Sequence, residues 1–337
     1  MDATRKKQIL VGAAVAALLI LPGLTNAAPV EVQALLVSDS GGWVTSPQKS
    51  FAVRSVKLDD IIGQLSVAVK PSGPVTLAVA GIKSRVDGLE VSADGGVLRI
   101  KGHHVSSVWD WRDWFNFSGD NKIDPRKLQV RLTVPVGTAL WVDGQIGDAV
   151  IGDTQAPLRF EAVTSNVRIG RVGEAKLSLA GSGKIDAAEI AGPLKLAIAG
   201  SGKVHIAKCK SVKADIAGAG DAQFGTIDGG LHLSIAGSGD VAADSINGPL
   251  HVSIAGSGSV KIANGLADPM HVSVMGSGSV DFGGMAVDPH VSAMGSANVR
   301  LKAYRGHLSS SGSVDIKVNG QSVKAGSDSG DDDSDSD

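Results

Sequence analysis

Seven basic side chains recur at one position of a repeated sequence, five residues before a glycine. They are Lys176, Lys195, Lys213, His232, His251, His271 and His290. Lysine ammonium groups attract anions, whereas imidazoles bind metal ions or change their charge near pH 6.5 (roughly). Such a column could therefore bind an anionic ligand, capture a metal ion or respond to pH. It could also be a solvated polar face with no ligand.

Metal capture is the most demanding of these chemistries, because the ligands must converge about 2.1 Å from one ion. If each basic residue lies on its own strand of a stacked sheet, neighbouring residues are about 4.8 Å apart. At most two imidazoles could then reach one ion, so we predict no metal site. Stacked imidazoles repel one another once protonated, and we therefore expect a less stable fold below about pH 6.

A second group of candidate residues lies in the segment 103–120, HHVSSVWDWRDWFNFSGD. Five of the chain's twelve aromatic residues are found there: Trp109, Trp111, Trp114, Phe115 and Phe117. An aromatic cluster in a polar insert could form a stacking platform for a sugar, a lipid headgroup or a partner protein. Alternatively, the insert is a hairpin whose aromatic rings fold back and plug the end of the core.

The sequence predicts no catalytic residue and no cofactor. The repeated Gly-Ser-Gly lacks the spacing of the Gly-x-Ser-x-Gly nucleophile motif. Acidic residues are scattered, with no column that could supply the paired carboxylates of a glycoside hydrolase. The position after each glycine corner varies from Lys184 to Asp221 to Ser259, which does not suit a calcium repeat. A β-helix carbohydrate-active enzyme is therefore the least favoured reading.

The elements that position these residues are tandem repeats. Gly-Ser-Gly or a close variant begins at Gly181, Gly200, Gly218, Gly237, Gly256, Gly276 and Gly295. The intervals are 19, 18, 19, 19, 20 and 19 residues, and a degenerate copy begins at Ser310. Apolar and polar residues alternate around each glycine, which is the period of a β-strand. Nineteen residues that already hold short strands leave no room for a helix, so we predict a parallel β-solenoid.

Four apolar columns, two before and two after each glycine corner, are predicted to face the core. A fifth inward column is expected at Ile190, Cys209, Ile227, Ile246, Leu266, Met285 and Tyr304. Cys209 occupies an isoleucine position in it, so we interpret this cysteine as a small buried hydrophobic residue. As the chain's only cysteine, it cannot form an internal disulfide.

The composition agrees with a narrow, repetitive core. The 337 residues include 44 glycines and 43% apolar residues but few aromatic ones. Lysine and arginine number 32 against 34 acidic residues, a balance that argues against a nucleic-acid-binding protein.

The chain's beginning is typical of a secretory signal peptide, which we assign to residues 1–27. A basic start precedes a thirteen-residue apolar run, Ile9–Leu21, and small residues follow. The run is short for a membrane-spanning helix, so an uncleaved anchor is the less favoured alternative. No lipidation cysteine follows. We expect an exported mature protein that does not span the membrane, located in the periplasm or at the cell surface.

Four further segments complete the predicted organisation: a linker (28–50), an N-terminal β region (51–136), the solenoid repeats (137–320) and an acidic tail (321–337). Whether the N-terminal β region continues the solenoid or caps it is left open. Six aspartates follow Ser327, so we expect this tail to be disordered. It could solubilise the protein, bind Ca²⁺ or dock on a basic partner. Removing the signal peptide (three basic residues, one acidic) and these aspartates changes the net charge from −2 to −4 and then to +2.

Residues 51–318 resemble the GIN-domain family of auto-transporter adhesin head domains. The resemblance rests on Phe51-Ala-Val, on the strand Leu65-Ser-Val-Ala-Val-Lys-Pro71, and on the tandem repeats of the types SIAGSGDV and SIAGSGSV. It implies an exported, right-handed parallel β-helix of the bacterial envelope with no catalytic residues. We therefore expect a non-enzymatic, adhesin-like protein that binds a glycan or an envelope protein. A periplasmic structural or sensory module is the alternative, and the oligomeric state is not predicted.

Overall fold

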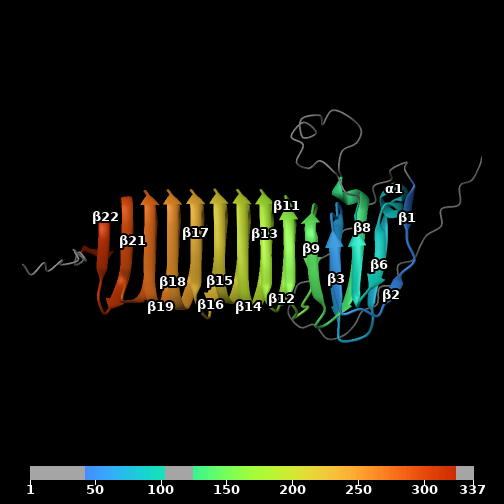
Figure 1. Ribbon diagram of the computed structural model, residues 1–337, viewed down its shortest axis with the longest axis horizontal. Coiled ribbons are helices and arrows are strands. Elements are labelled where there is room, and N and C mark those ends of the chain that lie inside the picture. The colour runs from blue at the N-terminus through green and yellow to red at the C-terminus, as the bar shows by residue number, and fades with distance from the viewer. Residues whose placement is uncertain (1–41, 103–123, 324–337) are drawn as a thin grey trace, which may run out of the picture. The chain divides into compact units, whose positions relative to one another are not determined.

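The computed structural model describes residues 42–102 and 124–323 of the chain. These residues form an all-β solenoid whose strands stack side by side along one axis (Figure 1). One turn of the coil, which we call a rung, takes about nineteen residues, since Gly237 pairs in register with Gly256. The β-solenoid and the rung length predicted from the repeats are thus confirmed.

The N-terminal part of the solenoid consists of short strands and two short helical segments. They are β1 (Trp43–Thr45), β2 (Lys49–Phe51), β3 (Ser55–Asp59), β4 (Gln64–Lys70), β5 (Val75–Ile82), α1 (Lys83–Asp87), β6 (Glu90–Asp94), β7 (Val97–Lys101), the 3₁₀ helix η1 (Pro125–Lys127), β8 (Leu128–Pro135), β9 (Ala139–Gln145) and β10 (Ala149–Ile151). Strands β1 and β2 overlap the segment that the sequence assigned to a linker and pair with β5.

The repeats form the rest of the solenoid, in which long strands bend around the corners of the coil. They are β11 (Leu158–Val163), β12 (Asn166–Val172), β13 (Ala175–Gly181), β14 (Lys184–Gly200), β15 (Lys203–Gly218), β16 (Asp221–Ile227), β17 (Leu231–Gly237), β18 (Asp240–Gly256), β19 (Ser259–Gly276), β20 (Ser279–Val287), β21 (His290–Arg305), β22 (Ser309–Val318) and β23 (Gln321–Ser322). From β9 to β22 every pairing between neighbouring rungs is parallel.

The four predicted apolar columns face the core, and a further buried column that the sequence analysis missed lies two residues before them, as at Leu231 and Leu250. In β17, for example, Leu233 and Ile235 are buried while Ser234 between them is exposed. The same residue types meet on successive rungs, as where Ile235 pairs with Ile254. Each fully buried side chain of this kind contributes about 1.5–3 kcal/mol. The columns therefore stabilise the stack from rung to rung, as expected for a solenoid.

The prediction of a fifth inward column is correct as far as Ile246 and wrong for the last three positions. Leu266 is partly buried, Met285 is 40% exposed and Tyr304 is 36% exposed. The core positions on these rungs are taken instead by Ala267 and Ala286, which are fully buried and pair with each other. The register shifts between Gly248 and Leu250 and again between Ile262 and Leu266. A constant spacing in the sequence therefore does not show which residue turns inward at this corner.

The corner glycines are required by the backbone. Gly237 has φ +134°, a conformation that residues with a Cβ rarely adopt. A Cβ there would also overlap the carbonyl oxygen of Gly218 on the previous rung. The backbone N–H of Ser238 donates to that same oxygen at 3.0 Å. The corner thus brings the backbones of two rungs into close contact, and only glycine, which has no Cβ, fits there.

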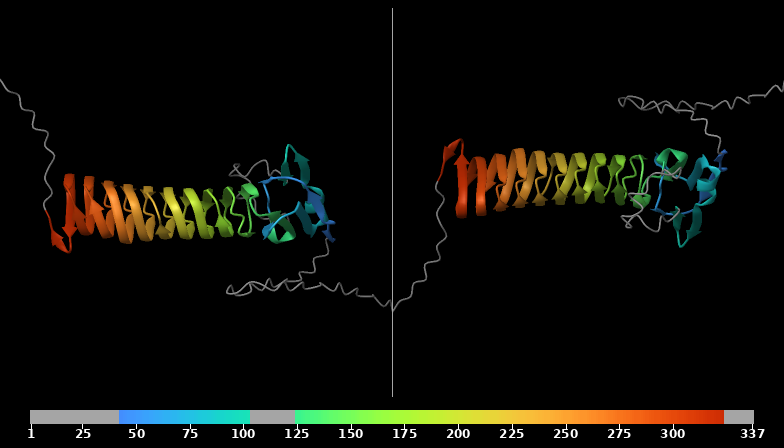
Figure 2. Two further views of the ribbon diagram at one scale, coloured as in Figure 1. Left: turned by 90° about the horizontal axis from the view of Figure 1, so that it is seen from below. Right: turned by 90° about the horizontal axis from the view of Figure 1, so that it is seen from above.

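The N-terminal β region both continues the solenoid and caps it. Strand β3 pairs in parallel with β7 on one side and β9 on the other, and β4 does the same with β8 and β10. The spatial order of rungs is therefore β7/β8, β3/β4, β9/β10. Antiparallel strands then surround this end: β5 pairs with β8, β1 and β2 pair with β5, and β6 pairs with β7 (Figure 2).

The C-terminal rung ends the core with small and polar residues. Ser310 and Gly312 continue the columns of Val291 and Ala293, so the first half of β22 adds little apolar surface. Strand β23 pairs antiparallel with the end of β22. This pairing occupies part of an edge that would otherwise offer a template for another chain.

The expected signal peptide, the aromatic insert and the aspartate-rich end of the tail lie outside the described residues, and their predicted roles stay predictions. Within the part of the chain that the structure describes, no helix is long and apolar enough to cross a membrane.

Candidate functional site

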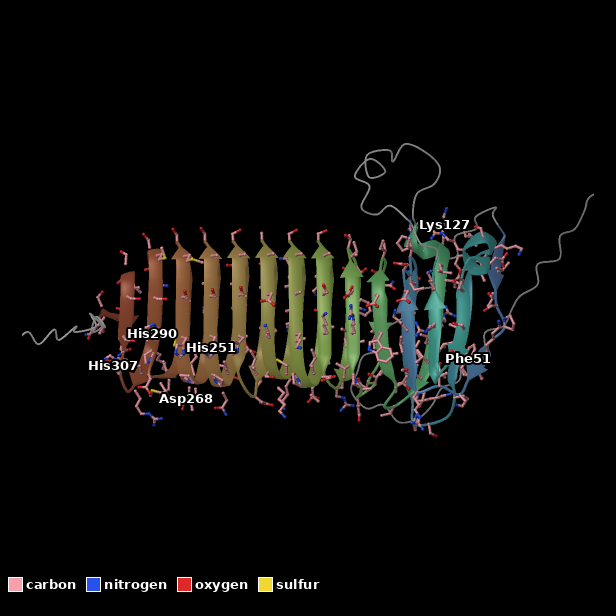
Figure 3. All side chains as sticks on the ribbon, in the orientation of Figure 1. Phe51, Lys127, His251, Asp268, His290 and His307 are labelled. Carbon is pink, nitrogen blue, oxygen red and sulfur yellow. The ribbon has the colours of Figure 1, made fainter. Side chains whose placement is uncertain are left out.

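The seven basic residues of the predicted column lie in register on neighbouring strands. Pairing runs unbroken through Lys176, Lys195, Lys213, His232, His251, His271 and His290. We call this set the basic strip. Its residues alternate with buried ones and therefore point outward. His290 is the first residue of β21 and His251 lies within β18, and the two are at the same level of the stack (Figure 3).

The column extends upstream to four residues that the sequence analysis missed. Lys176 pairs with Arg159, Arg159 with Trp141, Trp141 with Lys57, and Lys57 with Arg99. The spacing of 17 and 18 residues between Lys176, Arg159 and Trp141 could have revealed two of them. Lys57 and Arg99 could not be found by spacing, because their rungs are out of chain order.

Two of these upstream cations, Lys57 and Arg159, are neutralised by acidic residues two positions further along the strands, whereas the residue at that position after Arg99 is Lys101. Lys57 Nζ lies 2.9 Å from Asp59 Oδ1. Arg159 makes two such contacts, Nε to Asp143 Oδ1 at 3.1 Å and Nη2 to Glu161 Oε1 at 2.6 Å. The paired carboxylates raise the pKa of Arg159, first through its hydrogen bond with Glu161. Lys57 and Arg159 are therefore neutralised within this face.

The three lysines of the basic strip differ from these upstream residues. Lys176, Lys195 and Lys213 are exposed, and none forms an ion pair with any residue that the structure describes. In the neighbouring column the acidic residues give way to Ser178 and Ala197. Asp215 is the exception, exposed two residues after Lys213. Three unpaired cations thus follow one another on adjacent rungs, about 4.8 Å apart.

The four histidines form a stack. The ring centroids of His232 and His251 are 4.2 Å apart and those of His251 and His271 are 5.0 Å apart, with nearly parallel planes. The ring of His290 is tilted by 51° to that of His271, and its Nδ1 shares a 2.7 Å hydrogen bond with Ser309 Oγ. The stack is therefore regular over three rings and turns at the fourth.

Packing within the stack makes the central imidazoles less basic. Partial burial, and secondarily His232, lowers the pKa of His251 below its usual value of 6.5. Partial burial, followed by His251 and His290, lowers the pKa of His271 in the same direction. The Nδ1 atom of His251 is buried and has no hydrogen-bond partner among the described residues. Near pH 7 these two rings are therefore neutral.

Two further columns complete the face. The serine column, Ser234, Ser253, Ser273 and Ser292, lies beside the histidines and is also in register. The third column begins as exposed alanines, including Ala236 and Ala255, and ends at Met275 and Met294. Met275 is 52% exposed and Met294 78% exposed. The face therefore offers imidazoles, hydroxyls and an apolar border in parallel rows.

A shallow groove of about 490 Å³ follows the histidine half of this face. The four histidines and the serine column line it, and Lys213 and Asp215 stand at one end. The groove crosses the strands and is open to solvent along its length, which suits an extended ligand better than a small enclosed one.

The geometry does not favour a metal centre. Parallel rings 4.2 and 5.0 Å apart present their nitrogens side by side, whereas a metal ion needs them directed at one point. Among the residues that the structure describes, no group of three or more histidine, cysteine or acidic side chains could hold a metal ion.

The strand segment after each glycine corner supplies a contrasting surface. There, Lys184 Nζ lies 2.9 Å from Asp186 Oδ2, and Lys203 Nζ lies 3.3 Å from Asp221 Oδ2. The two lysines also lie in register, since Lys184 of β14 is directly beside Lys203 of β15. The same chain thus presents lysines that are neutralised and lysines that are not, on the same rungs.

Cys209 is buried, as predicted. It is 1% exposed and pairs with Ile190 and Ile227 in the core. Burial, with a smaller contribution from Asp228, raises the pKa of its thiol to about 12. The thiolate needed for nucleophilic chemistry is therefore absent at neutral pH.

A regular coil of parallel strands with an exposed, in-register row of side chains defines a β-solenoid with a linear surface site. The model of one family matches residues 147–225 and 226–322, together just over half of the chain: "Putative auto-transporter adhesin, head GIN domain". The chain belongs to this GIN-domain family, which confirms the resemblance seen in the sequence.

Solved structures similar to this chain come from Parabacteroides species. One is a putative lipid binding protein of Parabacteroides distasonis, with 15% identity and a TM-score of 0.40, covering 84% of this chain and 96% of that one. Another is a putative adhesin of the same species, with 17% identity and a TM-score of 0.38 over 83% and 98% of the two chains. A putative adhesin of Parabacteroides merdae has 13% identity and a TM-score of 0.38 over 85% and 98%. No curated protein matches the chain.

Proposed function

We propose that this protein is an exported, non-enzymatic binding protein of the bacterial envelope, adhesin-like in action, whose ligand lies on the face that carries the basic strip. The observation that carries the proposal is the row of unpaired lysines continued by stacked histidines, in register over seven rungs. Membership in the GIN-domain family supports an adhesin-like role.

Charge and shape favour binding over catalysis at this face. The strip is repeated along the coil and has no unique position, whereas a reaction needs a few groups converging on one bond. Repetition suits a ligand that is itself extended. A glycan or another envelope protein fits this description, and the aromatic residues Trp109, Trp111, Trp114, Phe115 and Phe117 are proposed as a second contact region.

The proposal includes three points that rest on the sequence. Residues 1–27 are a signal peptide, so the mature protein acts in the periplasm or at the cell surface. The coil is right-handed, as parallel strand crossovers nearly always are. The aspartate-rich end of the tail, from Ser327 onward, is proposed to be disordered because of its composition. A periplasmic structural or sensory module is the second candidate, and it is favoured if the protein never reaches the surface.

Cell fractionation together with a binding assay tests this function. We expect the protein in the envelope fraction of its host, and saturable binding of the purified protein to envelope fragments. The variant Lys176→Ala/Lys195→Ala/Lys213→Ala should bind at least fivefold more weakly. Unchanged binding by this variant, or a cytoplasmic location, would contradict the proposal.

A further inference from the structure

We propose that the ligand of the basic strip is a linear acidic polysaccharide that lies across the rungs, with its carboxylates on the lysines and its hydroxyls on the histidine and serine columns. This inference rests on the proposed function and adds the chemical class of the ligand.

The three lysines of the basic strip favour a negatively charged ligand. Lys176, Lys195 and Lys213 stand on consecutive rungs and form no ion pair with the described residues, whereas Lys184 and Lys203 on the next face are paired with Asp186 and Asp221. Like charges about 4.8 Å apart repel, and an anion bound along them removes that repulsion. The face is thus complementary to a row of carboxylates.

The ligand must be polymeric because each single contact is weak. An exposed lysine paired with one carboxylate gains little over water, and a small anion would touch only one or two of these lysines. A chain with a charge on each residue engages all three together, and each further contact is then intramolecular. The sugar residues of an extended chain repeat at roughly the spacing between neighbouring rungs, about 4.8 Å, so several can stay in register.

The histidine half of the face suits uncharged groups of the same polymer. His251 and His271 are neutral near pH 7, since the pKa of each lies below its usual value. Their ring nitrogens and the serine column supply donors and acceptors for sugar hydroxyls along the groove of about 490 Å³. Beside His232 and His251 the third column consists of Ala236 and Ala255, small side chains that let a flat chain approach, and beside His271 and His290 it consists of the exposed Met275 and Met294.

Two observations separate this ligand from other polyanions. The strip from Lys176 to His290 contains no Phe, Tyr or Trp, and the ring faces of His251 are covered by His232 and His271, so little aromatic surface is free to stack with the bases of a single-stranded nucleic acid. Asp215 stands exposed beside Lys213, where it repels a densely charged chain but can accept a hydrogen bond from a sugar hydroxyl. The face therefore suits a polymer with one charge per residue and many hydroxyls.

Calorimetric titration of the full chain with polygalacturonate tests the proposal, and dextran and monomeric galacturonate serve as comparison ligands. We expect binding of the acidic polymer that weakens with salt, and at least tenfold weaker binding of dextran and of the monomer. The variant Lys195→Ala/Lys213→Ala should lose at least tenfold in affinity. Asp215→Asn should bind more tightly.

The matched control is Lys184→Ala/Lys203→Ala. It removes the same net charge from the same rungs, so any effect of total charge is equal in the two double variants. We expect its affinity for polygalacturonate to change less than threefold. Equal losses in both variants, equally tight binding of the monomer, or equally tight binding of an oligothymidylate would overturn the proposal.

The outcome is separable from that of the proposed function. If envelope fragments bind in a strip-dependent way while polygalacturonate does not bind, the acidic-polysaccharide assignment fails and the binding function stands. If neither binds, both fail. Circular dichroism of each variant at the assay temperature verifies that the solenoid is folded.

Discussion

A lysine on this solenoid either forms an ion pair with a neighbouring carboxylate or faces solvent without one, and the residue two positions further along the strand contributes to this difference. Beside Lys57 that position is Asp59, which lies 2.9 Å from the ammonium group. Beside Lys176 it is Ser178, and beside Lys195 it is Ala197. Exposed ion pairs contribute at most about 1 kcal/mol to stability. Leaving the lysines unpaired therefore costs the fold little and leaves them free for a ligand.

The central histidines should make stability depend on pH. In the folded state the pKa values of His251 and His271 lie below the unfolded value of 6.5, so near that pH the unfolded chain binds more protons. The stability that the two neutral rings contribute is present above about pH 6.5 and is lost as the pH falls through their folded pKa values. We expect a lower Tm at pH 5 than at pH 8, measured by scanning calorimetry.

The variant His251→Gln/His271→Gln isolates this effect from that of the carboxylates. It should show a smaller fall in Tm between pH 8 and pH 5 than the parent protein. An identical fall in both proteins would exclude the histidine stack as the cause.

At the scale of elements, the corner is the most constrained part of the rung. A Cβ on Gly237 meets the carbonyl oxygen of Gly218, a backbone atom that cannot rotate away. We expect Gly237→Ala to destabilise the protein by about 3 kcal/mol or more, from steric overlap added to an unfavourable φ. Urea unfolding monitored by circular dichroism measures this free energy.

Gly96→Ala is the control for backbone strain alone. Gly96 also has a positive φ, +76°, but no atom lies within 4 Å of its Cβ position. Its substitution should cost only about 1–2 kcal/mol. Equal costs at Gly96 and Gly237 would mean that the close stacking of corners contributes nothing.

Constant spacing decided which elements could be predicted from the sequence. The basic strip could be predicted because each of its residues, from Lys176 to His290, lies five positions before a glycine corner within an alternating apolar pattern. The fifth core column failed at Leu266 and Met285, because the corner between rungs changes length there and only backbone register shows which residue turns inward. The groove and the lowered pKa values depend on the rotamers and packing of the histidines, which a repeat pattern does not contain.

Part of the face that carries the basic strip could not be predicted, because the N-terminal rungs do not stack in the order of the sequence. Lys57 and Arg99 belong to rungs that are assembled out of sequence, with β7 on one side of β3 and β9 on the other. The repeat spacing of about nineteen residues does not link residue 57 to residue 99 or residue 141. Alternation in the sequence marks strands such as β4 and β5, whereas β1 and β2 overlap the segment assigned to a linker, and alternation does not show which strands pair.

At the scale of the whole molecule, charge is distributed unevenly. The net charge of the chain is −2, yet six aspartates lie between Ser327 and Asp337. Deleting these eleven residues raises the net charge by six. Because charged surfaces steer charged partners, we expect severalfold faster association of the deletion variant with polygalacturonate at low salt. Stopped-flow fluorescence with a labelled polymer measures the rate.

Salt provides the check on this prediction. The Debye length falls from about 30 Å at 0.01 M salt to about 3 Å at 1 M, so the rates of the two proteins should converge as salt is added. A rate difference that persists at 1 M salt would point to direct contact by the tail, and equal rates at 0.01 M would contradict long-range steering.

The position of β3 and β4 between two later rungs has a consequence for how the protein is made. These strands are synthesised before either neighbour, so the growing chain can extend its sheet on both sides of them. The cap side is complete once β8 has been added, at residue 135, and every later rung joins the opposite side in chain order. The last strands made thus meet a template whose far end is already closed, and growth continues in one direction only.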